Sequence, residues 1–214
     1  MTHLYLIRHA ESILAHTMHI KDLMAEDRLT PEGVKQAERL RDRLAATGEI
    51  KADALLSSTL PRARQTAEIV APALQLPIVP DVDLEEMRPG DWGGMYWDEY
   101  VQKHPTPDPE RRPFDPIAPG AENWSQFLLR VAVTLYRIAD EHEGQTVVLM
   151  YHGGIVDGSL VCLMGLSTII RPPVRFDALL NASITHWERI EQDGAPRWRL
   201  HRYNDALHMR YKIS

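Results

Sequence analysis

Cysteine is nearly absent from this chain of 214 residues, in which Cys162 is the single copy. An intramolecular disulfide is therefore excluded, and the fold has to rest on packing alone, as is usual in a reducing compartment. Residues 1–8 also lack the basic region, the long apolar region and the cleavage site of a secretory signal. We accordingly expect a cytoplasmic protein.

Long hydrophobic runs and an excess of basic residues are missing as well. The longest apolar stretches, 146–151 and 158–166, fall far below the roughly 20 residues that cross a bilayer. A formal net charge of −6 argues against nucleic-acid binding, which needs a basic field. We therefore expect neither a membrane nor a nucleic-acid partner, and any anionic ligand must meet a local cluster of positive charge.

The composition that is present is that of an ordinary globular protein, with 44% hydrophobic and 25% charged residues. The length suits one domain with a sizeable core, and we expect a single domain over residues 1–214. Six of the 15 prolines lie between His104 and Gly120 and leave little room for regular structure. We interpret about 104–122 as an insertion loop over one end of the sheet.

Short apolar strands alternate with amphipathic helices along the chain. Bulky aliphatic residues predict strands at 3–7, 53–57 and 146–151. This alternation indicates an α/β fold with a mostly parallel central sheet covered by helices on both faces. Capping residues, prolines and apolar spacing predict helices over Thr30–Gly48, Thr59–Pro72, Asn123–Gly144 and Ile155–Leu166, and a hairpin of 182–190 with 197–203.

Polar residues follow the expected strands directly. The first strand ends at Arg8-His9, the second leads to Ser57-Ser58 with Arg62 just beyond, and the third ends at His152-Gly153-Gly154. Ligands of open α/β sheets gather at the carboxyl ends of the strands. Two histidines and two arginines should therefore converge on one cleft, together with N–H groups at helix starts that suit an anion.

Five segments, in order from residue 6 to residue 185, carry a pattern that resembles a known family. They are Leu6-Ile7-Arg8-His9-Ala10-Glu11-Ser12, Leu29-Thr30-Pro31-Glu32-Gly33 with Gln36-Ala37, 57–67, Tyr151-His152-Gly153-Gly154, and Asn181-Ala182-Ser183-Ile184-Thr185. The first resembles the Arg-His-Gly signature of the histidine phosphatase, or phosphoglycerate mutase-like, superfamily, and the third resembles its Ser-Ser-x-x-x-Arg-Ala-x-Gln-Thr-Ala segment. The resemblance implies a three-layer α/β/α sandwich of the phosphoglycerate mutase type.

The resemblance also implies a catalytic role for His9. A neutral imidazole is nucleophilic near pH 7, and a phosphoramidate is labile enough to hydrolyse afterwards. Arg8, Arg62 and His152 would surround the phosphoryl oxygens, with His152 protonated when phosphate is bound. The implied substrate-binding residues are Arg8, Ser12, Arg62, His152 and Gly153.

A proton for the leaving group would come from Glu86. The family supplies it from a Leu-x-Glu-x-x-x-Gly-x-Trp segment, which is similar to residues 84–92 here, and Glu86 falls on the matching glutamate. It would act as the acid in the first step and as the base in the second. Glu85, one residue earlier, is the competing assignment.

Three positions depart from the family pattern. Ala10 replaces the glycine of the signature, and Ala15 stands where many mutases carry asparagine, so that a phosphate hydrogen bond is missing or comes from Ser12 or a backbone group. Gly93 replaces the glutamate of the family's Trp-Glu-Gly, which affects contacts on the substrate side.

Several other residues have simpler interpretations. His16 and His19 have no cysteine or carboxylate at ligand spacing, so we expect no metal site. We expect Arg64 to be solvated and Cys162 to be a core residue. Arg111 and Arg112 are either solvated or reach an anionic part of the substrate, and the former is favoured. The aromatic residues that fit core packing and a substrate wall equally well are Trp92, Tyr96, Trp97 and Tyr100.

We expect a metal-independent phosphatase without a cofactor, which hydrolyses a small phosphorylated metabolite and releases inorganic phosphate. Two other functions stay open. The first is a cofactor-dependent phosphoglycerate mutase, an isomerase that uses the same phosphohistidine. The second is a phospholigand-binding module without catalysis. A homodimer is also possible on this sequence.

Overall fold

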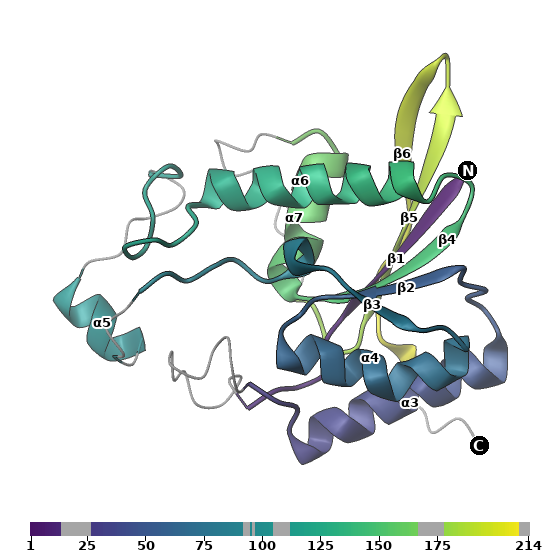
Figure 1. Cartoon of the computed structure of the whole chain (residues 1–214), viewed down its shortest axis with the longest axis horizontal. Coiled ribbons are helices and arrows are strands. Elements are labelled where there is room, and N and C mark those ends of the chain that lie inside the picture. Colours follow the sequence, from purple (N-terminus) through teal and green to yellow (C-terminus); the bar gives the residue numbers. More distant parts are fainter. Residues whose placement is uncertain (14–26, 92–94, 96, 105–111, 167–177, 210–214) are drawn as a thin grey trace.

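The computed structural model describes residues 1–13, 27–91, 95, 97–104, 112–166 and 178–209. Its centre is a six-stranded sheet in the order β3-β2-β4-β1-β5-β6 (Figure 1). The first four of these strands run parallel, and β5 and β6 are antiparallel to their neighbours. The strands are β1 (Thr2–Arg8), β2 (Ala54–Ser57), β3 (Ile78–Pro80), β4 (Thr146–Tyr151), β5 (Ile184–Gln192) and β6 (Ala195–Asp205).

Helices cover both faces of the sheet, with α3 and α4 below it and α6 and α7 above it in Figure 1. A buried apolar cluster lies on each face, one of them facing α3 and α4 and the other facing α6 and α7. The predicted three-layer α/β/α sandwich with a mostly parallel sheet is therefore confirmed. The helices are α3 (Pro31–Thr47), α4 (Pro61–Leu74), α5 (Trp97–Lys103), α6 (Trp124–Glu141) and α7 (Gly153–Leu163), with 3₁₀ turns η1 (Val82–Leu84) and η2 (Leu207–Met209).

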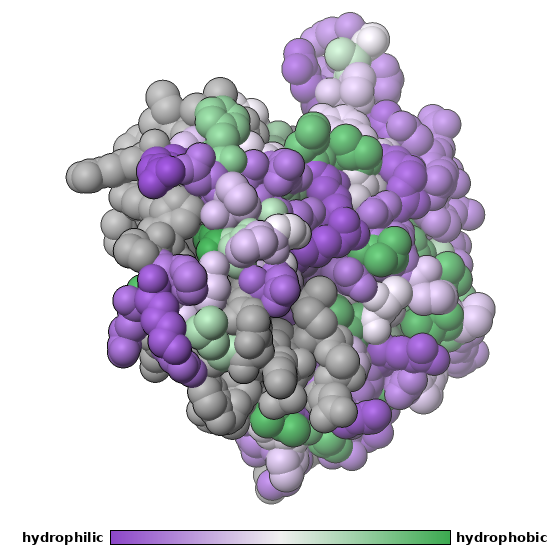
Figure 2. Space-filling view, turned by 60° about the vertical axis from the view of Figure 1, so that its left-hand side comes forward, coloured by the Kyte–Doolittle hydropathy of each residue, from purple (hydrophilic) through white to green (hydrophobic). Residues whose placement is uncertain are grey.

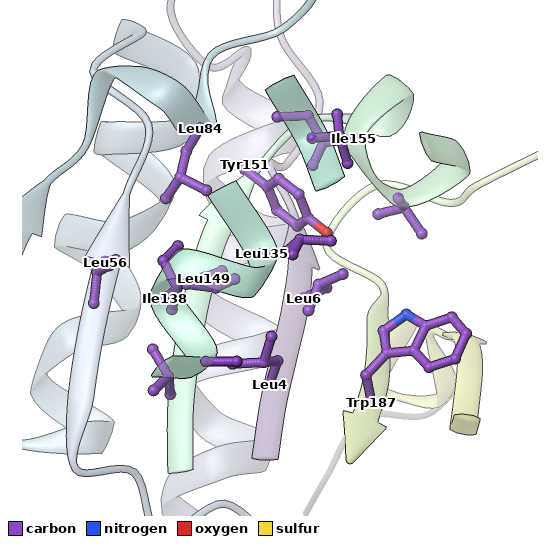
Figure 3. Packing of buried hydrophobic residues seen from close by; sticks show 14 of the residues in the cluster. Leu4, Leu6, Leu56, Leu84, Leu135, Ile138, Leu149, Tyr151, Ile155 and Trp187 are labelled. Atoms are coloured by element: carbon purple, nitrogen blue, oxygen red, sulfur yellow. The ribbon is translucent and has the colours of Figure 1, made fainter. Parts of the chain in front are cut away.

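The cluster that faces α6 and α7 is filled by side chains of the central strands. Its buried members include residues from β1, β4, β5 and α6. Figure 3 shows them interleaved between the sheet and α6. Burying such side chains removes apolar surface from water and holds the strands, and so their carboxyl ends, in fixed relation. Those labelled on these elements are Leu4, Leu6, Leu135, Ile138, Leu149, Tyr151 and Trp187.

Local sequence signals explain where α3 begins and ends. The Thr30 hydroxyl accepts a hydrogen bond from the Gly33 N–H at 2.9 Å, and Gly48 ends the helix with a left-handed φ of 57°. A Cβ atom at Gly33 would lie 1.9 Å from the carbonyl oxygen of Glu11. Only glycine therefore lets α3 start against the segment that follows β1, which is the structural reason for Gly33 in its motif.

The boundaries of three helices differ from their predictions, and one strand and one helix were not predicted. α4 begins after Leu60 rather than after Thr59, and it continues through Pro72 to Leu74. Its last turn stays helical because the neighbouring Ala73 and Leu74 pack against the core, which outweighs the hydrogen bond that Pro72 cannot make. The short edge strand β3 and the helix α5 were not predicted. α6 ends at Glu141, before Gly144, and α7 spans Gly153–Leu163 rather than Ile155–Leu166.

The proline-rich insertion is only partly described, because residues 105–111 lie outside the described ranges. Downstream of them, Ala118 and Ala121 are buried and form a small cluster with Tyr100 of α5. Tyr100 also stacks on His104, with ring centroids 4.7 Å apart. Of the predicted aromatic group, Tyr100 therefore packs in the interior rather than lining an open surface.

The face that carries α5 is mostly hydrophilic where residues are placed, and its hydrophobic residues occur in separate small patches (Figure 2). Among the described helices, none is both long and apolar enough to cross a membrane.

Candidate active site

The carboxyl ends of three adjacent strands bring the predicted site together. β4 lies between β1 and β2. The hydrogen bonds that pair β1 and β2 with β4 continue for one residue beyond the end of each of these two strands. The His9 N–H donates to the Tyr151 carbonyl at 2.8 Å, and the Ser58 N–H donates to the Met150 carbonyl at 2.9 Å. His9, Ser58 and His152 are therefore placed side by side by the parallel register.

The hydrogen bonds of His9 define its tautomer. Its Nδ1 atom lies 2.7 Å from the Ala10 carbonyl oxygen, which can only accept, so Nδ1 carries the proton. The Nε2 atom is then unprotonated and accepts a hydrogen bond from Nε of Arg62 at 3.2 Å. Of the two ring nitrogens, Nε2 therefore keeps a lone pair that is available for attack on an electrophile.

The backbone around His9 is fixed by residues of two other motifs. The Asn181 side chain donates to the His9 carbonyl at 3.1 Å, and the Ala182 N–H donates to the same oxygen at 3.3 Å. The Ala10 N–H donates to the Thr66 hydroxyl at 3.1 Å. Segments far apart in the sequence thus converge on one residue, and they hold the main chain that carries the imidazole.

His152 forms the second imidazole of the site. It is completely buried, and its ring centroid lies 5.1 Å from that of His9. Its Nε2 atom lies 2.8 Å from Oγ of Ser58, which in turn accepts the Leu60 N–H at 3.2 Å. The Nδ1 atom is buried and has no hydrogen-bond partner within the described part of the chain. Ser58 therefore orients His152 and leaves Nδ1 for another group.

Burial is the first cause of a lowered pKa at both imidazoles. It moves the pKa of His9 and of His152 well below the ordinary value, and the positive charge of Arg62 lowers both further. Both rings are thus neutral at neutral pH in this structure. For His9 this agrees with the tautomer, because a neutral imidazole has the free lone pair that a nucleophile needs.

Arg62 is held by a carboxylate that the sequence did not single out. Its Nη1 atom lies 3.2 Å from Oδ2 of Asp27, whose side chain is fully buried. Burial lowers the pKa of Arg62, and the Asp27 carboxylate opposes that change. The ion pair keeps a buried cation beside the neutral His9, where it can meet an anionic ligand. No motif or spacing marks Asp27, so only tertiary proximity identifies it.

Arg8 approaches the site from the end of β1. Its guanidinium donates to the Leu179 carbonyl, and its buried Nε has no partner within the described residues. A Cβ atom built on Gly153 would lie 3.5 Å from this Nε, so Arg8 lies against the start of α7. Two guanidiniums and the first N–H groups of α7 accordingly surround the imidazoles with positive electrostatic potential.

Glu86, and not Glu85, reaches the start of α7. Its Oε2 atom accepts the Gly154 N–H at 3.0 Å, and its Oε1 atom accepts the Met87 N–H at 2.9 Å. Glu85 instead accepts a hydrogen bond from the Thr59 hydroxyl and faces Arg88. The Glu86 carboxylate is therefore bonded to Gly154, the second residue after His152, and Glu85 does not share that position.

The remaining predicted residues are accounted for as follows. Ser12 is buried, and its main chain forms an isolated antiparallel bridge with that of Leu29. Arg64 is exposed, as predicted, and pairs with Glu68. Arg112 is exposed and pairs with Asp115, which agrees with its solvated interpretation. Cys162 is half-buried, and burial raises the pKa of its thiol to about 11. Outside the described residues lie Ala15, His16, His19, Trp92, Gly93, Tyr96 and Arg111, and the side chain of Trp97 is likewise not described.

No cluster of three or more metal-binding side chains is found within the part of the chain that the structure covers. The charged groups at the strand ends are instead of the kind that binds a phosphoryl group directly. The fold and the cationic groups together are those of an α/β protein whose sheet offers a phosphate-compatible edge at the carboxyl ends of its strands.

Comparison with known families agrees with this class. The profile of the histidine phosphatase superfamily (branch 1) matches residues 4–206. The chain belongs to this superfamily, which confirms the resemblance seen in its five motifs.

Several relatives span most of the chain. The metal-independent phosphoserine phosphatase of Arabidopsis thaliana is 29% identical over 219 residues, covering 98% of this chain and 84% of the relative. The uncharacterized phosphatase PhoE of Bacillus subtilis is 28% identical and covers 73% and 72% of the two chains. The family and these named relatives agree on one class, and the chain is accordingly an enzyme of the phosphatase class.

Solved structures share the fold over nearly the whole length. YhfR of Bacillus stearothermophilus is 29% identical, with a TM-score of 0.74 and coverage of 98% of this chain and 100% of the other. The mycobacterial glucosyl-3-phosphoglycerate phosphatase Rv2419c is 24% identical, with a TM-score of 0.73 and coverage of 94% and 98%.

Proposed function

We propose that this protein hydrolyses a small phosphomonoester through a phosphohistidine on His9. The observation that carries the proposal is the tautomer of His9, in which Nδ1 donates to the Ala10 carbonyl and Nε2 keeps its lone pair. Nε2 attacks phosphorus, the bond from phosphorus to the ester oxygen breaks, and the leaving alkoxide takes a proton from Glu86. A water molecule then attacks the phosphohistidine, Glu86 accepts the proton of that water, and inorganic phosphate leaves.

The cationic groups serve the transferring phosphoryl group. Arg8 and Arg62 bind its oxygens, assisted by Ser12 and by the N–H of Gly153 at the start of α7. His152 is neutral in the structure, and the charge of a bound phosphate would favour its protonated form, so that Nδ1 becomes a donor. Arg62 leaves its hydrogen bond with His9 as it turns to the phosphate, which frees the attacking lone pair.

A small phosphorylated metabolite is the proposed substrate. Two relatives, from Arabidopsis thaliana and Hydrogenobacter thermophilus, are named phosphoserine phosphatases, and each is 29% identical to this chain. A solved relative from Entamoeba histolytica is described in complex with phosphoserine. A panel that includes phosphoserine, 3-phosphoglycerate, sugar phosphates and nucleotides, ranked by kcat/KM, identifies the preferred ester.

The intermediate is tested by trapping. The protein is mixed rapidly with a ³²P-labelled ester, quenched without acid and analysed by peptide mass spectrometry, and we expect the label on His9. His9→Ala should lose both label and turnover. His142→Ala should retain both, because His142 lies at the C-cap of α6 beside the start of β4, at the edge of the sheet opposite the strand ends that carry His9. Label on another side chain would overturn the proposal. Conversion of 3- to 2-phosphoglycerate faster than phosphate release would favour the mutase alternative.

A further inference from the structure

Arg130 of α6 forms the densest set of hydrogen bonds to the segment that carries Glu86. Its Nη1 atom donates to the carbonyls of Asp83 and Glu85, both at 2.8 Å, and its Nη2 atom donates to the carbonyl of Glu86 at 3.2 Å. One guanidinium thus satisfies three main-chain acceptors within four residues. This segment begins within the 3₁₀ turn η1 and pairs with no strand among the described residues, so these bonds replace those of a regular element.

Glu122 completes the arrangement from the other side. It accepts Nε of Arg130 at 2.7 Å and Nη2 at 2.6 Å, which is the two-pronged geometry of a strong arginine–carboxylate pair. Its Oε2 atom also accepts the Arg88 N–H at 2.9 Å, and its own N–H donates to the Arg88 carbonyl at 3.0 Å. The main chain is therefore held immediately before and shortly after Glu86.

The pair is well suited to hold a fixed position. The Arg130 and Glu122 side chains are only 10% and 13% exposed, and the guanidinium lies 5.3 Å from the ring centre of Phe127. Burial raises the pKa of Glu122, but the hydrogen bonds from Arg130 and from the Arg88 N–H outweigh this and bring the pKa below its ordinary value. The carboxylate thus stays ionised at neutral pH, and the ion pair between Arg130 and Glu122 stays formed.

We propose that Arg130, held by Glu122, is a positioning residue that keeps the Glu86 carboxylate at the start of α7, where it can reach the leaving oxygen. This inference rests on the proposed role of Glu86 as proton donor. Arg130 itself touches main-chain carbonyls and no reacting atom. Its effect should therefore appear in the two steps that Glu86 serves, and the step that differs between substrates is protonation of a poor leaving group.

The test compares an aryl with an alkyl ester. Nitrophenolate leaves without a proton, whereas the alkoxide of glycerol phosphate needs one, so a misplaced Glu86 slows phosphoryl transfer from the second ester alone. The weaker activation of water in the following step affects both esters equally, so the difference between the esters reports the acid. We expect Arg130→Met to lower kcat for glycerol phosphate by about a hundredfold, which is a typical effect of a displacement near 1 Å. The loss for p-nitrophenyl phosphate should stay below about tenfold, with little change in KM.

Arg137 provides the matched control. It lies two turns further along α6 and also anchors this region, but through side chains, with Nη2 2.6 Å from Oδ2 of Asp81. Arg137→Met should leave the ratio of the two kcat values within about twofold of the parent. Should Arg130→Met fold poorly, Arg130→Lys and Glu122→Gln test the same point, and each should show the same selective loss for the alkyl ester at a smaller size.

A double variant separates positioning from general damage. In a Glu86→Gln background, Arg130→Met should lower kcat for glycerol phosphate by less than about threefold further, because the group it positions is already gone. Equal losses for both esters, full additivity in the double variant, or the same selective loss in Arg137→Met would each overturn the proposal. If Glu86→Gln alone fails to distinguish the two esters, the proposed acid is wrong. If Glu86→Gln distinguishes them and Arg130→Met does not, the positioning role is wrong.

Discussion

The Nε2 atom of His9 lies 3.2 Å from Nε of Arg62, and both side chains are buried. This relationship joins a neutral nucleophile to the cation that is proposed to bind its target. It also makes the protonation of His9 depend on Arg62, because the guanidinium charge adds to the effect of burial in lowering the pKa of the imidazole.

Arg62→Met should raise the pKa of His9 toward its ordinary value. Protonated His9 cannot attack, so the acid limb of the kcat/KM profile should move to higher pH, and the loss of a phosphate ligand should lower the plateau by about 10²–10³-fold. The limb is measured with one substrate throughout. Arg64→Met, on the exposed side of α4, serves as the control and should leave the limb in place. A limb that stays or moves to lower pH contradicts the prediction.

Ser58→Ala should impair the enzyme through His152. The variant removes the hydroxyl 2.8 Å from Nε2, so that neither nitrogen of this fully buried ring keeps a partner among the described residues. We expect a stability loss of about 1–3 kcal/mol and a lower kcat. Ser57→Ala loses only a bond to the Ser58 carbonyl and should retain most activity. Urea unfolding and steady-state kinetics measure both effects, and equal kcat values for the two variants would argue against this role of Ser58.

Gly154→Ala should displace the Glu86 carboxylate. A Cβ atom at this position would lie 2.3 Å from Oε1 of Glu86, closer than any stable contact, whereas one at Gly153 would lie at an ordinary 3.5 Å from Arg8. Turnover of an alkyl phosphate should fall by about 10²-fold or more in Gly154→Ala, with a smaller loss for an aryl phosphate. Gly153→Ala should lose less of both. Similar losses of the alkyl ester in the two variants would contradict this account.

His208 should make the protein less stable in acid. Burial and the neighbouring Arg43 lower its pKa to about 4, although Asp205 and Glu49 oppose the change. An unfolded histidine has a pKa of about 6.5, so the unfolded state binds more protons between these values. The contribution of neutral His208 to the free energy of unfolding is therefore present in full above about pH 6.5 and is lost as the pH falls toward about 4.

The corresponding measurement is urea unfolding at pH 7 and pH 5. His208→Gln should reduce the difference in unfolding free energy between the two conditions by about 2 kcal/mol relative to the parent. His142→Gln, which replaces a half-buried histidine at the end of α6, should leave that difference unchanged. An identical pH dependence in His208→Gln and the parent protein would show that His208 does not titrate as described.

Local features of the sequence were enough to predict most elements. Thr30, Gly48 and Asn123 act through hydrogen bonds to their own helix ends, so their effect does not depend on distant residues. The strands 146–151 and 3–7 are apolar because they lie in the centre of a sheet covered on both faces. The identity of the residues directly after these strands therefore indicated where His9 and His152 would meet.

Elements in which packing overrides the local preference of the residues could not be predicted from local sequence features. Pro72 usually ends a helix, yet α4 continues past it because the next residues pack into the core. The edge strand β3 spans three residues, too few for a periodic pattern, and forms because Ile78 pairs with Leu55. In each case the outcome depends on contacts between segments rather than on the residues in the segment itself.

Periodicity, capping residues and strand ends are local properties, so they were sufficient to predict the order of the main elements and the residues at the carboxyl ends of β1, β2 and β4. Which groups support those residues depended on the packing of the layers. It chose Glu86 over Glu85 for the start of α7, paired Asp27 with Arg62, and brought Arg130 to the segment that carries Glu86. These relationships join residues from different elements, and their distances exist only once the layers have packed.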